Sequence, residues 1–330
     1  MAAGARSTSG GARGVVVLVA APGYGRTTAL ERSVEEPTGP GGAGPLLVGA
    51  RALLAAGAVG AGVGRLLVDD VDHLDDPDLT TLAGLVADLP PDVRVVLATT
   101  RPLDAAVRTA LRRPVLVRCA ADLALTVEGT ARVLREDHGV TDLDVADAVH
   151  AATAGWPLLV HLAADVAATP GADAAYVRAR LAAADSPCRH WLADRVLTRL
   201  DAVALDVLDR AVRVGPVAPG LLREVAGEQA AEAVRVLTVT GLLGPAEPLL
   251  SGPGQAAAPR AEDDTDVVPV AVVPAVAAAV RAERAPLPPG AATSAARSAA
   301  DWFRARGRHL LAAQLLRVAD EPLAAARVVV

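Results

Sequence analysis

One short stretch of this sequence combines glycines, hydroxyl side chains and a cation at a spacing that suits phosphate chemistry. Residues 15–19, VVVLV, are five consecutive apolar residues that predict a buried strand. A loop with Gly23 and Gly25 follows, and residues 26–28, RTT, open a predicted helix. Because the N–H groups of such a loop and of a helix N-terminus converge on one point, the layout favours a bound anion. The stretch therefore predicts a phosphate-binding P-loop.

The stretch departs from the P-loop pattern G-x-x-x-x-G-K-[ST] at two positions. Ala20 stands at the first glycine, and Arg26 stands at the lysine whose ammonium reaches the β- and γ-phosphates. Gly23 offsets the first departure, whereas the second weakens the expectation of hydrolysis, and the alternative is an ordinary strand-turn-helix. The Thr27 hydroxyl is a candidate Mg²⁺ ligand. The candidate nucleotide-binding residues of the loop are Gly23, Tyr24, Gly25, Arg26, Thr27 and Thr28.

A second candidate element is a pair of carboxylates at the end of an apolar run. Residues 66–68, LLV, predict a buried strand, and Asp69 and Asp70 follow it directly. Carboxylates at the carboxyl end of a parallel strand lie where open α/β sheets bind ligands. In this Walker B arrangement Asp69 holds the water shell of Mg²⁺ and Asp70 orients a water molecule. The alternative is a solvated acidic turn, because four more aspartates follow at 72, 75, 76 and 78.

The elements that must position these residues alternate between strand and helix patterns over residues 14–120. A third buried strand is predicted at 93–98, and Arg101 follows it after two threonines. A polar side chain at that strand end can sense a γ-phosphate, although a solvated loop arginine is the alternative. The alternation predicts an α/β core with a parallel sheet covered by helices.

Composition excludes several classes of function. At 330 residues the chain suggests two or more domains, with 52% hydrophobic and 2% aromatic residues. A net charge of −6 gives no basic footprint for nucleic acid. Cys119 and Cys188 show no metal or disulfide spacing. Residues 1–13 lack a signal peptide and predict a disordered tail. We therefore expect a cytoplasmic chain that has no membrane segment.

Helical patterns dominate the rest of the sequence. Residues 121–185 predict a helical block interrupted by Gly155-Trp156-Pro157. Residues 186–285 predict four successive amphipathic helices, a long low-complexity loop, a strand at 267–273 and a further helix at 274–283. Three helices with a strand pair and a long loop suggest a winged helix. Residues 286–330 predict a linker and a helical hairpin broken near Gly307, similar to the first unit of a helix-pair repeat.

Five motifs in order carry a resemblance to a known family: LVAAPGYGRTT, LLVDDVDHL, LATTR, LALTVEGTARVL and TAGWPLLVHLAA. The sequence resembles the MalT-like branch of the STAND P-loop NTPases, the large LuxR-type regulators. The resemblance implies an ATPase core, a helical lid at 121–185, a winged helix and the start of a repeat sensor. It implies ATP or ADP with Mg²⁺ as cofactors, Asp70 and Arg101 as catalytic residues, and Pro157 close to the adenine. The repeat array and the C-terminal LuxR helix-turn-helix of the family are not found in this sequence.

Two functions follow as expectations. The first is a signal-transduction switch of a transcriptional regulator that binds ATP or ADP, hydrolyses ATP very slowly, and acts through protein partners or self-association. Direct DNA binding by this chain is not expected. The alternative is a degenerate scaffold that binds no nucleotide and acts through helical protein contacts.

Overall fold

The computed structural model describes residues 14–35, 44–60, 62–246, 268–285, 288 and 290–329. The predicted tail at 1–13 and part of the predicted linker lie outside these ranges. The chain divides into two compact units. The first contains the described residues of Met1–His150 with Gly155–Ala164 and Val239–Gly241, and the second contains those of Ala151–Ala154, Asp165–Thr238 and Leu242–Val330. The division into five parts made from the sequence stays a prediction beside these two units.

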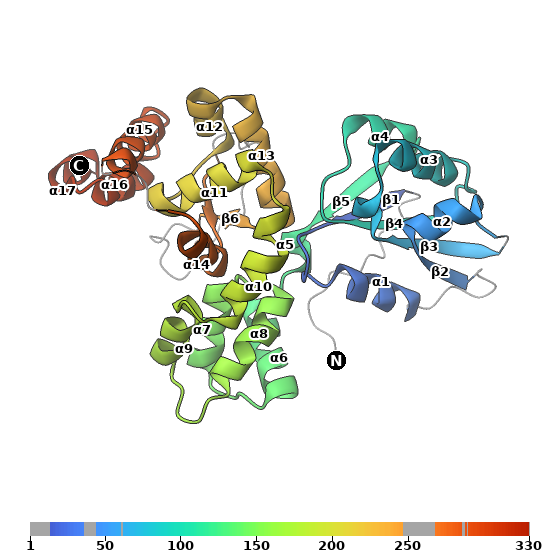
Figure 1. Ribbon diagram of the computed structural model, residues 1–330, viewed down its shortest axis with the longest axis horizontal. Helices are drawn as coiled ribbons and strands as arrows, with labels where there is room; N and C mark the ends of the chain where they lie inside the picture. The colour runs from blue at the N-terminus through green and yellow to red at the C-terminus, as the bar shows by residue number, and fades with distance from the viewer. Residues whose placement is uncertain are drawn as a thin grey trace. The chain divides into compact units, whose positions relative to one another are not determined.

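The first unit is built on a five-stranded parallel sheet with the strand order β2-β3-β4-β1-β5 (Figure 1). The strands are β1 (Val15–Val19), β2 (Gly44–Gly49), β3 (Val63–Asp69), β4 (Arg94–Thr99) and β5 (Val115–Cys119). The register aligns Val15 of β1 with Val95 of β4 and with Val115 of β5. The predicted α/β core with a parallel sheet is therefore confirmed.

Helices cover both faces of this sheet. On one face Val17, Leu66 and Leu97 join a buried core with α2 (Ala50–Ala56), α3 (Asp76–Ala87) and α4 (Ala105–Ala110). On the other face Leu18 and Leu67 pack with Leu30 of α1 (Arg26–Glu35). Successive strand residues point to opposite faces, so strands buried on both sides are continuous apolar runs.

The helix that starts after Thr126 has a side-chain cap. The Thr126 hydroxyl accepts a hydrogen bond from the Gly129 N–H at 3.0 Å and starts α6 (Val127–His138), which ends at Gly139 with φ 71°. A threonine N-cap and a left-handed glycine after the last turn are common ends of a helix. The remaining elements up to residue 167 are the 3₁₀ turn η1 (Val71–His73), α5 (Ala120–Leu123), α7 (Leu143–Thr153) and α8 (Pro157–Ala167).

The rest of the chain is mainly helical. The helices are α9 (Ala174–Ala182), α10 (Pro187–Arg195), α11 (Ala202–Val214), α12 (Pro219–Ala226), α13 (Glu228–Thr240), α14 (Pro274–Glu283), α15 (Ala291–Ala305), α16 (His309–Val318) and α17 (Pro322–Val329), with a 3₁₀ turn η2 (Leu197–Arg199). Two short strands, β6 (Leu243–Pro245) and β7 (Val270–Val272), pair antiparallel. No helix among the described residues is long and apolar enough to cross a membrane.

The sequence predicted a hairpin of two helices at the C-terminal end, but the structure has three helices there. The break near Gly307 is present between α15 and α16, but a second break separates α16 from α17. Asp320 adopts a left-handed conformation with φ 59°, and Pro322 opens the next helix. The left-handed residue interrupts the helical path after α16, and proline suits the first position of α17 because a backbone donor is not needed there.

Candidate functional site

The loop between β1 and α1 has the backbone expected of a glycine-dependent anion site. Gly23 and Gly25 have φ angles of 80° and 78°, values that only glycine adopts at little cost. A Cβ built on Gly25 meets nothing within 4 Å, so backbone conformation and not space requires glycine there. Helix α1 starts directly after it at Arg26. The N–H groups of the first turn have no partner inside the helix and are available to an anion.

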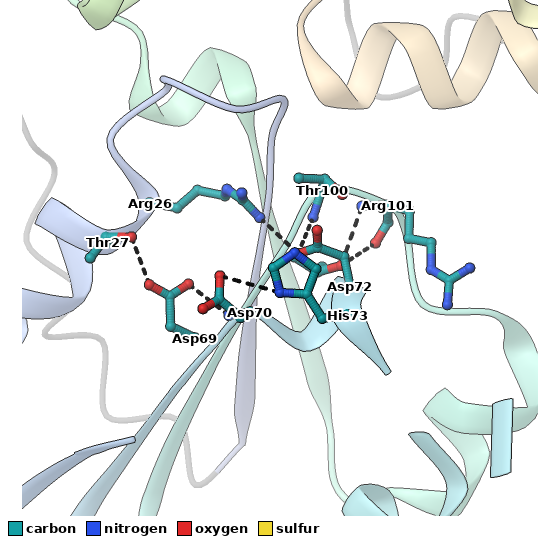
Figure 2. A network of polar contacts seen from close by, with 9 residues as sticks. Arg26, Thr27, Asp69, Asp70, Asp72, His73, Thr100 and Arg101 are labelled. Carbon is teal, nitrogen blue, oxygen red and sulfur yellow. Dashed lines mark hydrogen bonds and ion pairs between the residues drawn. The ribbon is translucent and has the colours of Figure 1, made fainter. Parts of the chain in front are cut away.

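Thr27 and Asp69 meet at the carboxyl edge of the sheet. The Thr27 hydroxyl donates a hydrogen bond to Asp69 Oδ2 at 2.6 Å, across 42 residues of sequence (Figure 2). Thr27 is the second residue of α1, and Asp69 is the last residue of β3. A hydroxyl and a carboxylate are oxygen ligands of the kind that Mg²⁺ prefers. The two side chains predicted to hold Mg²⁺ are therefore brought together.

Asp70 is held in an unusual conformation beside them. Its φ and ψ angles of 57° and 34° lie in the left-handed region, and its side chain is 60% exposed. Such a conformation costs a non-glycine residue about 1–3 kcal/mol and is common at functional sites. The turn places the Asp70 carboxylate 3.9 Å from His73 Nδ1. His73 was not predicted as a site residue, although the spacing in DDVDH brings it one turn after the acidic pair.

Arg26 forms an ion pair with an aspartate that the sequence did not single out. Arg26 Nη1 lies 3.4 Å from Asp72 Oδ1, and the two side chains are 13% and 11% exposed. The same Asp72 oxygen accepts a hydrogen bond from the Thr100 N–H at 3.2 Å. Asp72 is thus not part of a solvated acidic turn. Because six aspartates lie within residues 69–78, the sequence does not indicate which of them is buried.

The surroundings of Asp72 favour its ionised form. Burial raises its pKa, but the hydrogen bond from Thr100 and the charge of Arg26 outweigh burial and hold the pKa below its ordinary value. A folded-state pKa below that of the unfolded chain means that Asp72 stabilises the fold at neutral pH. That stabilisation is lost as the pH falls through the lowered pKa.

Arg101 is engaged with the backbone. Its Nη2 donates a hydrogen bond to the Leu74 carbonyl at 3.0 Å, and its N–H donates to Thr99 Oγ1 at 3.2 Å. Figure 2 shows the guanidinium directed away from Thr27 and Asp69. In this arrangement Arg101 ties the end of β4 to the end of η1. Its catalytic role as a sensor arginine stays a prediction.

Tyr24 is part of the packing that supports the loop. Its side chain is 4% exposed, and its ring stacks on Trp156 with centroids 4.4 Å apart. Its hydroxyl donates to the Gly241 carbonyl at 2.9 Å. Burial, with a smaller contribution from Cys119, raises the pKa of Tyr24 and keeps the phenol neutral. The aromatic ring of Tyr24 is therefore packed inside the protein, and its role as a nucleotide-binding residue stays a prediction.

The Gly155-Trp156-Pro157 turn is hydrogen-bonded to the loop between β1 and α1. Trp156 is completely buried, and its indole N–H donates to the Pro22 carbonyl at 3.1 Å. The Leu158 N–H donates to the Gly23 carbonyl, also at 3.1 Å. Pro157 is the first residue of α8, where its missing donor costs nothing. These contacts join the loop to the start of α8, and the role of Pro157 at an adenine stays a prediction.

Residues that could hold Mg²⁺ are few. Among the described residues, no group of three or more His, Cys, Asp or Glu side chains is arranged to hold a metal ion. The Thr27–Asp69 pair fits a cation that takes its other oxygen ligands from water and phosphate, as Mg²⁺ does in nucleotide sites.

Neither a family model nor a curated protein matches the sequence. Solved structures do match. RuvB from Thermotoga maritima, a Holliday junction branch migration motor, is 18% identical, with 71% of this chain and 82% of that chain covered and a TM-score of 0.40. A STAND protein with a tetratricopeptide repeat sensor from Pyrococcus horikoshii is 13% identical, with coverages of 93% and 46% and a TM-score of 0.33. Cdc6p from Pyrobaculum aerophilum is 14% identical, with coverages of 82% and 88% and a TM-score of 0.33.

These similarities carry no argument about function. The chain covers 46% of the Pyrococcus protein, a signal transduction ATPase with numerous domains. TM-scores between 0.33 and 0.40 at 13–18% identity are too low to transfer an activity or a partner. Only the residues of the site indicate a function, and the MalT-like and LuxR-type identity stays a prediction.

Proposed function

We propose that the chain binds ATP or ADP together with Mg²⁺ at the loop between β1 and α1. The observation that carries the proposal is the 2.6 Å contact between Thr27 and Asp69, residues far apart in sequence that meet beside a glycine loop. Their oxygens would hold Mg²⁺, while the loop and the first turn of α1 would hold the phosphates. Mg²⁺ would supply charge neutralisation on the phosphates, and Asp70 would orient a water molecule.

We infer that the site works as a switch with very slow turnover. Arg26 stands at the lysine position, so phosphate attraction is retained while hydrolysis is impaired. The lid at 121–185, the winged helix at 186–285 and the repeat unit after 286 belong to this proposal as responding parts. Self-association or protein partners would carry the signal to transcription. Direct DNA binding is not part of the proposal, because the net charge is −6.

Replacing Asp69 with alanine tests the proposed site. We expect the affinity for Mg²⁺-ATP to fall by about 10–100-fold, the range for losing a carboxylate that supports a bound metal. Affinity for ATP without Mg²⁺ should change much less, because the phosphate contacts remain. Isothermal titration calorimetry with and without Mg²⁺ measures both. Asp78→Ala is the matched control, since Asp78 is an exposed acid in the first turn of α3.

The alternative scaffold function has one observation in its favour. Arg26 is already paired with Asp72, so part of its positive charge is neutralised by the protein and attracts a phosphate less strongly. A scaffold predicts no heat from the wild-type chain at millimolar ATP or ADP, with or without Mg²⁺. That result would remove the proposed nucleotide site and leave helical protein contacts as the function.

Nucleotide binding should also slow amide hydrogen exchange in the turn that includes Trp156. The Leu158 N–H and the Trp156 indole both donate to carbonyls of the P-loop, so ordering of the loop restrains the turn. We expect exchange to slow across residues 154–159 when saturating Mg²⁺-ADP is added, as measured by mass spectrometry. Peptides from α16, in the second unit, provide the internal reference. Slower exchange in the P-loop with no change at 154–159 would contradict the coupling.

A further inference from the structure

An ion pair occupies the side of the candidate site that faces the end of β4. Arg26 is the first residue of α1, and Asp72 lies on the 3₁₀ turn η1 that follows β3 (Figure 2). The pair joins Nη1 of Arg26 to Oδ1 of Asp72 at 3.4 Å. Arg26 stands at the P-loop position whose cation contacts the β- and γ-phosphates. The cation at the phosphate position is therefore bound to an anion of the protein itself.

Burial makes this pair more than a surface contact. The Arg26 and Asp72 side chains are 13% and 11% exposed, so water screens their attraction less than it screens an exposed pair. Asp72 is also fixed independently of Arg26, because its carboxylate accepts the Thr100 N–H at the end of β4. Of the two partners, the flexible arginine side chain is the one free to move. A phosphate that recruits Arg26 must compete with a carboxylate that stays in place.

We propose that Asp72 is an internal anion that competes with the β- and γ-phosphates of a nucleotide for Arg26, and so sets nucleotide affinity. This inference rests on the proposed function and names its regulation. The competition acts only on phosphates within reach of Arg26. ATP and ADP carry such phosphates, whereas AMP does not. Asp72 therefore lowers the affinity for ATP and ADP and leaves the affinity for AMP unchanged.

Asp72→Asn should raise the affinity for Mg²⁺-ATP and Mg²⁺-ADP. Asparagine keeps an oxygen that accepts the Thr100 N–H but loses the charge that holds Arg26. We expect a gain of roughly tenfold, the scale of one partly buried ion pair. Affinity for AMP should stay within about twofold, because its phosphate does not draw on Arg26. Calorimetry or competition with a fluorescent ADP analogue measures all three ligands.

Two further variants separate the ion pair from general effects of charge. Asp76→Asn removes the same charge from an exposed residue of α3 and should change ATP affinity by less than about twofold. In an Arg26→Gln background the Asp72→Asn gain should disappear, because no cation remains to be released. If thermal melts show that Asp72→Asn is unfolded, Asp72→Ser takes its place, since its hydroxyl can also accept the Thr100 N–H.

The outcomes distinguish this inference from the proposed function. Wild-type binding of ATP with no gain in Asp72→Asn overturns the inference alone, and so does an equal gain in Asp76→Asn. A gain that persists in the Arg26→Gln background also overturns it. Absence of ATP and ADP binding in the wild type and in every variant overturns the proposed function, and the inference with it.

Discussion

Replacing Arg26 with lysine is expected to raise the rate of single-turnover ATP hydrolysis by about 10²–10³, by analogy with restoring one donor that acts only in a transition state. A guanidinium is larger than an ammonium, is planar, and donates through a fixed fork. In the structure Arg26 Nη1 is paired with Asp72 Oδ1 at 3.4 Å. A lysine ammonium is a compact point charge that can follow the charge developing on the transferred phosphoryl group.

In the measurement, ATP is mixed with excess protein, the reaction is quenched at successive times, and the ADP formed is quantified. Nucleotide affinity should change by less than about tenfold in Arg26→Lys, because both side chains are cations in the ground state. Arg26→Gln is the control that removes the charge, and it should lower affinity without raising the rate. A wild-type chain that already hydrolyses ATP as fast as Arg26→Lys would show that arginine serves this position equally well.

Much of the fold could be predicted because the central strands β1, β3 and β4 are buried on both faces. Continuous apolar runs at 15–19 and 66–68 predicted β1 and β3, which the structure places one strand apart with β4 between them. The shortest elements gave weaker signals. Helix α4, of six residues, was not predicted, and α17 was merged with α16. Six to eight residues hold too few turns to show a helical period.

The chemistry of the site was predictable where one local motif carried it. Thr27 follows the glycine loop after β1, and Asp69 is the last residue of β3. Because the carboxyl ends of parallel strands meet at one edge of the sheet, the two side chains come together there. The roles of Asp72 and Tyr24 could not be predicted. Asp72 differs from the neighbouring aspartates only in where η1 directs it. Tyr24 contacts Gly241 across 217 residues, a distance over which no sequence period operates.

Gly155→Ala is expected to destabilise the first unit by about 4 kcal/mol or more, the exceptional end of single-substitution effects. Gly155 has a φ of 70°, and a Cβ built there lies 2.1 Å from the Leu125 carbonyl oxygen. That oxygen belongs to the backbone, and the same segment is fixed by the hydrogen bond from the Leu125 N–H to the Gly155 carbonyl at 2.8 Å. Neither of these two backbone segments can move away from the added methyl group without breaking the hydrogen bond between them.

Gly139→Ala is the matched control, because it separates backbone strain from the collision. Gly139 has nearly the same φ, 71°, but a Cβ built there meets nothing within 4 Å. Its substitution should cost only about 1–2 kcal/mol, the price of a left-handed conformation in an L-residue. Urea unfolding read by hydrogen exchange in the sheet measures both, since two compact units need not unfold together. Because Gly155 precedes Trp156, whose indole donates to the Pro22 carbonyl, the collision should also release the loop between β1 and α1. Equal costs for Gly155→Ala and Gly139→Ala would mean that the turn has room for a methyl group and does not fix the loop.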